Sequence, residues 1–570
     1  MYICIRKIQN MKKWMMVATL VAATITGKAQ QVNPCNYLGT ADLSYIKNTV
    51  QYLASDSLKA RYPGTPADRE VQQFLQSEFE KWGLKPIFES GMRQSFTFPD
   101  GVTTLKETYL SVNGQSLKPG FDFYPVQYTA PKGKAVGATV YVQYGINAPE
   151  LDYNNLADKA LKDKIVVMDV SSPDGIHPHS SYAKYHALSK RIGELEKRGA
   201  SAVLLINSQG DANDPRKDFS DLSSSGIPVV FIANKEKAEL LKRPQAVEMS
   251  VAVKEQIVET ANIAGLIDNG ADNTVIIGAH FDHLGMGGSG SLYTGKPAIH
   301  NGADDNASGI GGLLALARYL AKADAPNLSD YNYLMVAFAG EEKGLLGSNY
   351  LVKHLNLERY NPRFMYNMDM IGRMEENTLA VNGTGTSPVW DEIIAKAHCG
   401  LNIKKSPTGT GPSDHTNFYY QELPVLHFFT GTHKDYHKPT DDYEYLNTEG
   451  IQHTLNFMLH LIEKSASFKE MVFTPTKDKK RKAARFTVTL GVMPDYMYDG
   501  KGMKIDGVSP GKTADKAGLE AGDVVIKMGD MDIEDIYQYM EALSNYKNGD
   551  STTVTLLRGE EQITRSVTFQ

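Results

Sequence analysis

Five short segments rich in acidic residues and histidine, in a fixed order along the chain, constrain this sequence more than any other feature. They are GAHFD at 278–282, GADDN at 302–306, AGEE at 339–342, NMD at 367–369 and YHKP at 436–439. Most of them end or follow a short apolar run, as polar residues do where a buried strand ends. Together they offer two histidines and a surplus of carboxylates, the ligand mixture of a site for two zinc ions with one carboxylate left over as a base. The pattern predicts a metal-dependent hydrolase.

The segments around these motifs alternate between strand and helix patterns. Residues 274–278 and 333–338 are continuous apolar runs, typical of buried strands, and the Leu- and Ala-rich stretch 309–323 between them predicts a helix. This alternation predicts an α/β fold with a doubly wound, mixed sheet. In such folds the ligand sites lie beyond the carboxyl ends of the strands.

The length and texture of the chain predict several domains. A chain of 570 residues is too long for a single hydrophobic core. Short β-rich runs replace the alternating pattern between about 115 and 258, and the polar, basic stretch 477–482 is typical of a linker. The predicted division is a leader at 1–29, a catalytic domain at 30–115 and 259–465, an inserted β-rich domain at 116–258, a linker at 466–484 and a C-terminal domain at 485–570.

The first residues are typical of a secretory signal peptide. Lys12 and Lys13 provide the positive start, 14–25 the apolar stretch and 27–29 a small-residue cleavage site. The apolar stretch is shorter than the ~20 residues of a membrane-spanning helix. We therefore expect an exported protein, periplasmic or secreted, without stable membrane insertion once the leader is removed.

Charge and cysteine content narrow the functional classes. Removing the leader takes away five of the 60 basic residues and none of the 66 acidic ones, which leaves a net charge of −11. Such a charge does not favour binding to nucleic acid or to an anionic membrane. Of the three cysteines, Cys35 and Cys399 remain, and the sequence leaves open whether they form a disulfide. Cys399 is interpreted as a buried thiol, because no catalytic motif surrounds it.

The residue types in these segments fit a metal site for separate physical reasons. His280 and Asp282 lie two apart at a strand end, so their side chains share a face and the carboxylate can hold the second imidazole nitrogen. Asp305 follows in a glycine-rich loop, where a carboxylate can bridge two cations. The adjacent carboxylates of Glu341 and Glu342 would repel each other unless a cation or a proton lies between them.

The motifs resemble those of a known family. AHFD, GADDNASG, GEE, NMDM and YH, together with LASD at 53–56 and GTP at 64–66, are similar to motifs of the di-zinc exopeptidases that include bacterial leucyl aminopeptidases, yeast aminopeptidase Y, glutamate carboxypeptidase II and the transferrin receptor. The likeness extends from about 40 to 465. It implies that the insert is a protease-associated domain. The tail resembles a PDZ domain, with LGV at 490–492 as its carboxylate-binding loop.

The resemblance also implies a role for each site residue. Two zinc ions would be held by five residues: one by His280 and Asp369, the other by Glu342 and His437, and both by the bridging Asp305. Glu341 would be the general base, Asp282 the partner of His280, and Tyr436 the donor to the developing oxyanion. No ligand of the set is missing.

The expected function is that of an exported zinc-dependent exopeptidase, foremost an aminopeptidase that removes N-terminal residues from peptides. Three alternatives stay open. The first is a carboxypeptidase of the same fold, in which Arg373 would receive the terminal carboxylate. The others are a glutaminyl cyclase, whose relatives bind one zinc ion, and a non-enzymatic peptide-binding protein. Expected partners are peptide substrates and, at the PDZ domain, protein or peptide C-termini.

Overall fold

The computed structural model describes residues 35–569 apart from 177–179, 211–213, 216, 218, 220–221, 223–224, 289, 294, 323–327, 477–487, 496–497, 499 and 547–549. The predicted leader at 1–29 and the basic part of the predicted linker, 477–482, lie outside the described residues. Among the residues that are described, no helix is long and apolar enough to cross a membrane.

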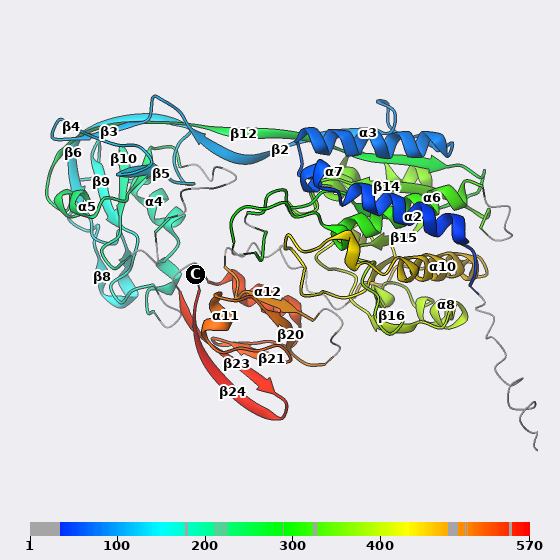
Figure 1. Ribbon diagram of the computed structural model, residues 1–570. Helices are drawn as coiled ribbons and strands as arrows, with labels where there is room; N and C mark the ends of the chain where they lie inside the picture. The colour runs from blue at the N-terminus through cyan, green and yellow to red at the C-terminus, as the bar shows by residue number, and fades with distance from the viewer. Residues whose placement is uncertain are drawn as a thin grey trace, which may run out of the picture.

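A mixed β-sheet forms the centre of the half of the molecule that carries the five motifs (Figure 1). Its strands, in spatial order, are β17 (Asn402–Ser406), β16 (Thr378–Asn382), β18 (Val425–Phe429), β15 (Pro362–Met368), β13 (Asn273–His280), β14 (Tyr331–Phe338) and the long β12 (Ala246–Ile267). The strands from β18 to β14 are parallel, whereas β12 joins β14 and β16 joins β18 in antiparallel fashion. The predicted α/β fold with a mixed sheet is confirmed.

Helices cover both faces of this sheet because both faces of its strands are apolar. On β14, Tyr333 and Met335 belong to one apolar core, and Leu334 and Val336 to another on the opposite face. The helices of the first core are α2 (Thr40–Leu53), α3 (Pro66–Lys81), α6 (Gly309–Leu320), α8 (Trp390–Lys396) and α10 (Thr448–Ser465). Those of the second core are α7 (Leu346–His354) and α9 (His415–Tyr419).

Two long antiparallel strands connect this sheet to a β-rich region. Strand β2 (Arg93–Thr104) pairs with β12, and Figure 1 shows the pair running from the central sheet to the region on the left. That region contains β3 (Tyr109–Val112), β4 (Gln115–Leu117), β5 (Phe123–Pro125), β6 (Lys132–Tyr141), β9 (Ile165–Asp169), β10 (Ala202–Ile206), β11 (Val229–Ile232), α4 (Leu188–Lys197) and α5 (Lys235–Leu241). It has two apolar clusters of its own, so the expectation of a β-rich region is confirmed.

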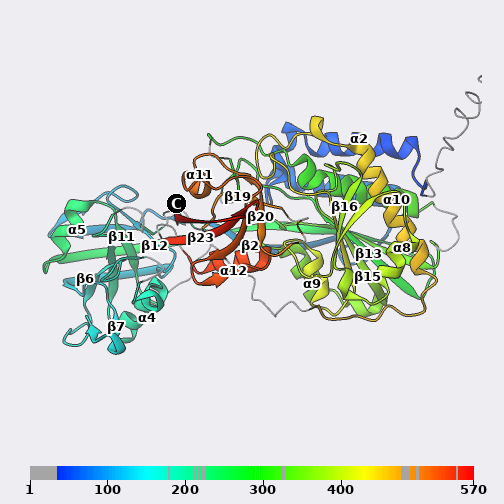
Figure 2. The ribbon, with the colours of Figure 1, turned by 90° about the horizontal axis from the view of Figure 1, so that it is seen from below.

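The C-terminal part has a separate sheet and a separate core. It contains β19 (Val492–Pro494), β20 (Met503–Val508), α11 (Thr513–Lys516), β21 (Val524–Met528), β22 (Met531–Asp532), α12 (Ile536–Ser544), β23 (Ser551–Arg558) and β24 (Glu561–Thr568). Figures 1 and 2 both show this part between the β-rich region and the central sheet.

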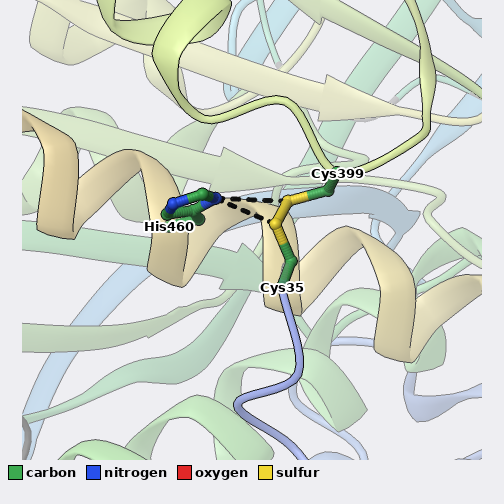
Figure 3. Close-up of side chains that lie close together, drawn as sticks. All are labelled: Cys35, Cys399 and His460. Atoms are coloured by element: carbon green, nitrogen blue, oxygen red, sulfur yellow. Dashed lines mark hydrogen bonds between the residues drawn. A yellow bond between two sulfur atoms is a disulfide. The ribbon is translucent and has the colours of Figure 1, made fainter. Parts of the chain in front are cut away.

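Cys35 and Cys399 form a disulfide with a Cα–Cα distance of 5.6 Å. The bond joins the segment before α2 to the segment between α8 and β17. In Figure 3 the ring of His460, on α10, points at the two sulfurs, and its Nδ1 lies 2.9 Å from Sγ of Cys35. The interpretation of Cys399 as a buried thiol is therefore wrong, and the disulfide that the sequence left open is present. The residue is buried, as expected, but it has a partner 364 positions away in the sequence.

Candidate metal centre

The candidate metal ligands lie at the carboxyl ends of three neighbouring parallel strands. His280 is the last residue of β13, Glu342 follows β14 shortly after its end, and Asp369 follows β15 directly. Strand β13 pairs in parallel with both β14 and β15, so the three strand ends meet at one edge of the sheet. The position of each motif behind an apolar strand is what brings these side chains together.

Asp305 lies between the two candidate histidines. One of its carboxylate oxygens, Oδ1, is 3.3 Å from Nε2 of His280, and the other, Oδ2, is 3.1 Å from Nε2 of His437. The residue is 3% exposed. A carboxylate that turns each of its oxygens to a different imidazole has the geometry of a bridging ligand.

Each of these histidines has a second carboxylate beside it. Nε2 of His280 is 3.3 Å from Oδ1 of Asp369, and Nε2 of His437 is 3.5 Å from Oε2 of Glu342. The structure therefore brings together two ligand sets that share Asp305, in the grouping that the family resemblance implied.

The donor atoms of this site fit divalent cations such as zinc. Imidazole nitrogens and carboxylate oxygens are zinc ligands, and donor atoms of His280, Asp305 and Asp369 all lie within 4.8 Å of one another. With Glu341 and Glu342, four carboxylates crowd one largely buried place. Such a concentration of negative charge away from water is stabilised by bound cations.

The electrostatics separate the roles of Glu341 and Asp305. Burial raises the pKa of Glu341 well above its usual value, and the carboxylates of Asp369 and Glu342 add to the shift. For Asp305, burial alone would raise the pKa, but the surrounding imidazoles, His283 foremost, hold it well below its usual value. The two neighbouring carboxylates thus have pKa values shifted in opposite directions, Glu341 by burial and Asp305 by the imidazoles around it.

Asp282 contacts the ligands differently from what the sequence predicted. Its carboxylate oxygen Oδ1 is 3.9 Å from Nδ1 of His280, and the nearer acceptor for that nitrogen is the backbone carbonyl of Asp282, at 3.2 Å. The carboxylate instead accepts the backbone N–H groups of Glu341 at 3.0 Å and Glu342 at 3.3 Å. One buried residue thus orients both a histidine and the pair of glutamates.

Tyr436 lies against the site and lines its cavity. Its ring stacks on that of His437, with 3.8 Å between the ring centroids. The cavity has a volume of about 340 Å³, and Asp305, Glu341, Asp369 and His437 are among its lining residues. A substrate in this cavity therefore meets the ligands, the candidate base and the phenol of Tyr436 at once.

His283 is a residue of the site that sequence analysis missed. It is buried, its Nδ1 is 2.6 Å from Oε1 of Glu342, and its ring meets that of His437 edge to face. Its donor atoms group with those of Asp305 and Glu342. The signal that could have found it is the second histidine of the segment HFDH at 280–283.

Arg61 is the second missed residue, and it holds the loops of the site from behind. Its fully buried guanidinium donates to four backbone carbonyls: Nε to Phe281 at 2.7 Å, Nη1 to Leu53 at 2.7 Å and Asn301 at 2.6 Å, and Nη2 to Gly302 at 3.0 Å. The hydrogen bonds to Leu53, Asn301 and Gly302 connect the end of α2 to the loop that leads to Asp305.

Gly302 is required in that loop by its conformation and its neighbours. Its φ is +57°, and a Cβ there would lie 2.1 Å from the carbonyl oxygen of Asp305 and 2.5 Å from the ring of His283. The glycine of the GADDN motif therefore permits the close approach that places Asp305 in the site.

Asp441 supports the same loop through two of its backbone N–H groups. Its Oδ2 accepts the backbone N–H groups of Asp304 at 2.9 Å and Asp305 at 3.1 Å. Its Oδ1 is 3.2 Å from Nη2 of Arg373, which also lies 3.4 Å from Asp435. Arg373, the candidate for binding a substrate carboxylate, is thus engaged by two aspartates of the chain and is not among the residues that line the cavity.

Comparison with known proteins agrees with this geometry. Residues 262–462 match the model of peptidase family M28, and residues 477–569 match that of the PDZ domain. Aminopeptidase YwaD of Bacillus subtilis (strain 168) is 25% identical over 497 residues, which cover 82% of this chain and 97% of that protein. A probable leucine aminopeptidase of Trichophyton verrucosum is 30% identical over 176 residues, covering 29% of this chain and 44% of that protein.

Solved structures that resemble this chain include aminopeptidases. The zinc aminopeptidase BSAP of Bacillus subtilis is 24% identical with a TM-score of 0.44, over 77% of this chain and 96% of that structure. The ligand motifs lie inside the matched segment 262–462, and the C-terminal sheet lies inside the segment that matches the PDZ model. Residues 262–462, which carry the candidate ligands, therefore match peptidase family M28, and residues 477–569 behind them match the PDZ domain.

Proposed function

We propose that this protein is an aminopeptidase that uses two zinc ions to remove N-terminal residues from peptides. The observation that carries the proposal is the position of Asp305, whose two oxygens face His280 and His437 in two complete ligand sets. The relatives support it, because those compared above are named aminopeptidases and one is named a zinc aminopeptidase.

The residues of the site divide the work of peptide hydrolysis. Bound zinc would polarise the scissile carbonyl and lower the pKa of the attacking water. Glu341 accepts the proton of that water and delivers it to the leaving amine, and its raised pKa, caused first by burial, favours holding the proton between the two transfers. Tyr436, which lines the cavity beside His437, donates from its phenol to the oxygen that gains negative charge.

The alternatives differ in what they would need from the site. A carboxypeptidase needs a cation for the substrate's terminal carboxylate; Arg373, the residue expected in that role, is paired with Asp435 and Asp441, and the cations among the lining residues of the cavity are Lys404 and Lys405. A glutaminyl cyclase would need one zinc ion, whereas both ligand sets are present here. A non-enzymatic peptide-binding protein has no need for Glu341 beside a complete set of ligands.

The test compares Glu341→Gln with Glu342→Gln in assays of metal content and of turnover. The first variant removes the base and should retain zinc while losing nearly all turnover, whereas the second removes a ligand and should lose zinc as well. Unblocked tripeptides should lose their first residue, and N-acetylated ones should stay intact, as followed by mass spectrometry. Substantial turnover by Glu341→Gln would remove Glu341 from the role of base, and loss of the last residue would assign a carboxypeptidase.

We also propose that the protein is exported and that residues 116–258 are a protease-associated domain that limits access to the site. The disulfide between Cys35 and Cys399 supports export, because such bonds persist in oxidising compartments. The leader pattern at 12–29 supports it too. N-terminal sequencing of the exported protein tests the proposal, and a mature chain that begins at Met1 would contradict it.

A further inference from the structure

The PDZ domain contributes one side of the cavity in which the catalytic residues lie. The cavity of about 340 Å³ is lined at the metal site by Glu341, Asp369 and His437. Its PDZ side comes from the loop between β19 and β20, the first residue of β20, and the start of α12 with the residue two before it; these residues are Asp495, Tyr498, Met503, Glu534 and Ile536. The site therefore does not open directly to solvent on this side.

A specific contact holds the PDZ domain at this place. The hydroxyl of Thr432 donates to the backbone carbonyl of Pro494 at 2.8 Å. Thr432 lies in the loop after β18, five residues before His437, and it lines the cavity. Pro494 ends β19, an outer strand of the PDZ sheet that pairs with β20 along its other edge. The loop that carries a metal ligand is thus bonded to a strand end of the PDZ domain.

The size of the cavity between the metal site and the PDZ domain restricts what can enter it. About 340 Å³ lies near the lower end of the range of ~300–1,000 Å³ that is typical of small-molecule pockets. Next to the metal site the space is bounded by the apolar side chains of Met370, Phe429 and Tyr436, and on the PDZ side by the half-buried Ile536. An extended segment of a few residues fits such a space, whereas the N-terminus of a folded protein does not.

We propose that the PDZ domain is the outer wall of the substrate cavity and restricts this enzyme to short peptides. The residues that follow the scissile bond pass between the loop at Thr432 and the start of α12. This inference rests on the proposed aminopeptidase function, because that function places the cleaved bond at the metal site. It assigns the PDZ domain a part in substrate selection within its own chain.

Two isoleucines of the PDZ domain provide a matched pair of variants. Ile536 and Ile563 are both half-buried and both pack against the PDZ core, but only Ile536 lines the cavity. In the full-length protein we would measure kcat/KM for a dipeptide, a tripeptide, a hexapeptide and a decapeptide with the same N-terminal sequence. Ile536→Trp should lower kcat/KM for the longer peptides by about tenfold or more relative to the dipeptide. Ile536→Ala should shift the preference toward longer peptides, and Ile563→Trp should leave it unchanged.

A binding measurement separates this inference from the proposed function. The sequence has only three tryptophans, none of them in the PDZ domain. In the Glu341→Gln background, a tripeptide should change the emission of an indole introduced at position 536 and leave one introduced at 563 unaffected. If the wild type cleaves no peptide but this emission change is seen, the aminopeptidase proposal is wrong, and the proposal that the PDZ domain forms the outer wall of the cavity is supported. The proposal about the PDZ domain would be overturned if the two tryptophan variants showed the same dependence of kcat/KM on peptide length and the same change in emission.

Discussion

The buried guanidinium of Arg61 provides the sharpest test of how the metal site is held in place. Arg61→Met keeps a long apolar side chain but removes all donors to the carbonyls of Leu53, Phe281, Asn301 and Gly302. Each buried carbonyl left without a donor costs ~1–3 kcal/mol. Partial rehydration makes the four losses less than additive, so the expected fall in the free energy of unfolding is about 3–5 kcal/mol, as for a broken buried ionic network.

The kcat/KM of Arg61→Met should fall even under conditions where the variant remains folded. Phe281 lies between His280 and Asp282, and Gly302 begins the turn to Asp305, so movement of these carbonyls displaces ligands of the site. A misplacement of ~1 Å can lower the rate by ~10²-fold. We expect kcat/KM of Arg61→Met to fall by about that factor at a temperature where the variant is still folded.

Denaturant unfolding followed by tryptophan fluorescence measures the stability term. Trp82 and Trp390 lie at the end of α3 and in α8, so their emission reports on the catalytic domain. The control is Arg69→Met, since Arg69 is exposed and donates only to the carbonyl of Gly64 at 3.0 Å; its effect should stay within ~0.5 kcal/mol. Arg61→Lys should be intermediate, because it keeps the charge but not the planar fork. If Arg61→Met and Arg69→Met unfold at the same denaturant concentration, the reasoning is refuted.

Three further outcomes are expected. Asp441→Ala removes the acceptor for the backbone N–H groups of Asp304 and Asp305. The variant should bind zinc ~10–100-fold more weakly in a competition with a chelator. An unchanged zinc affinity would contradict the role of Asp441 in supporting this loop. Cys399→Ser should lower stability by about 3–5 kcal/mol, because the disulfide to Cys35 closes a long loop, and reduction of the wild type should reproduce that loss. Removal of metal should lower the melting temperature. A free zinc concentration a thousandfold above Kd should restore ~4 kcal/mol to the free energy of unfolding. A melting temperature that does not change when zinc is added would argue against a structural contribution of the ions.

Three of the five candidate ligands, His280, Glu342 and Asp369, could be predicted from the sequence because each ends or closely follows a strand that the sequence marks clearly. His280 and Asp369 end or follow continuous apolar runs, and parallel pairing of β13 with β15 then brings the two together. The fold class follows from the same alternation of strands and helices. For these elements, local pattern and tertiary position agree.

The supporting residues could not be predicted, because nothing local distinguishes them. Arg61 reaches the carbonyl of Phe281 across 220 positions of sequence, and an arginine after a helix is usually solvent-exposed. The pairing of Cys35 with Cys399 spans 364 positions, and spacing alone does not decide whether two cysteines meet. The place of the PDZ domain against Thr432 depends on tertiary packing beyond a linker, which carries no pattern of its own.

A complete set of ligands is not the same as a complete site. The segment matched by the family model, 262–462, contains all five candidate ligands and the supporting Asp441. Arg61 lies outside it, and so does α2, which packs against α6 and the turn at 303–308 with Val50 and Leu53 fully buried. The loop that carries Asp305 is therefore held both by Asp441 of the matched segment and by Arg61 outside it. The N-terminal helices contribute no candidate ligand, yet Arg61 and α2 contact the loop that carries Asp305, and such supporting contacts orient the ligands of a metal site.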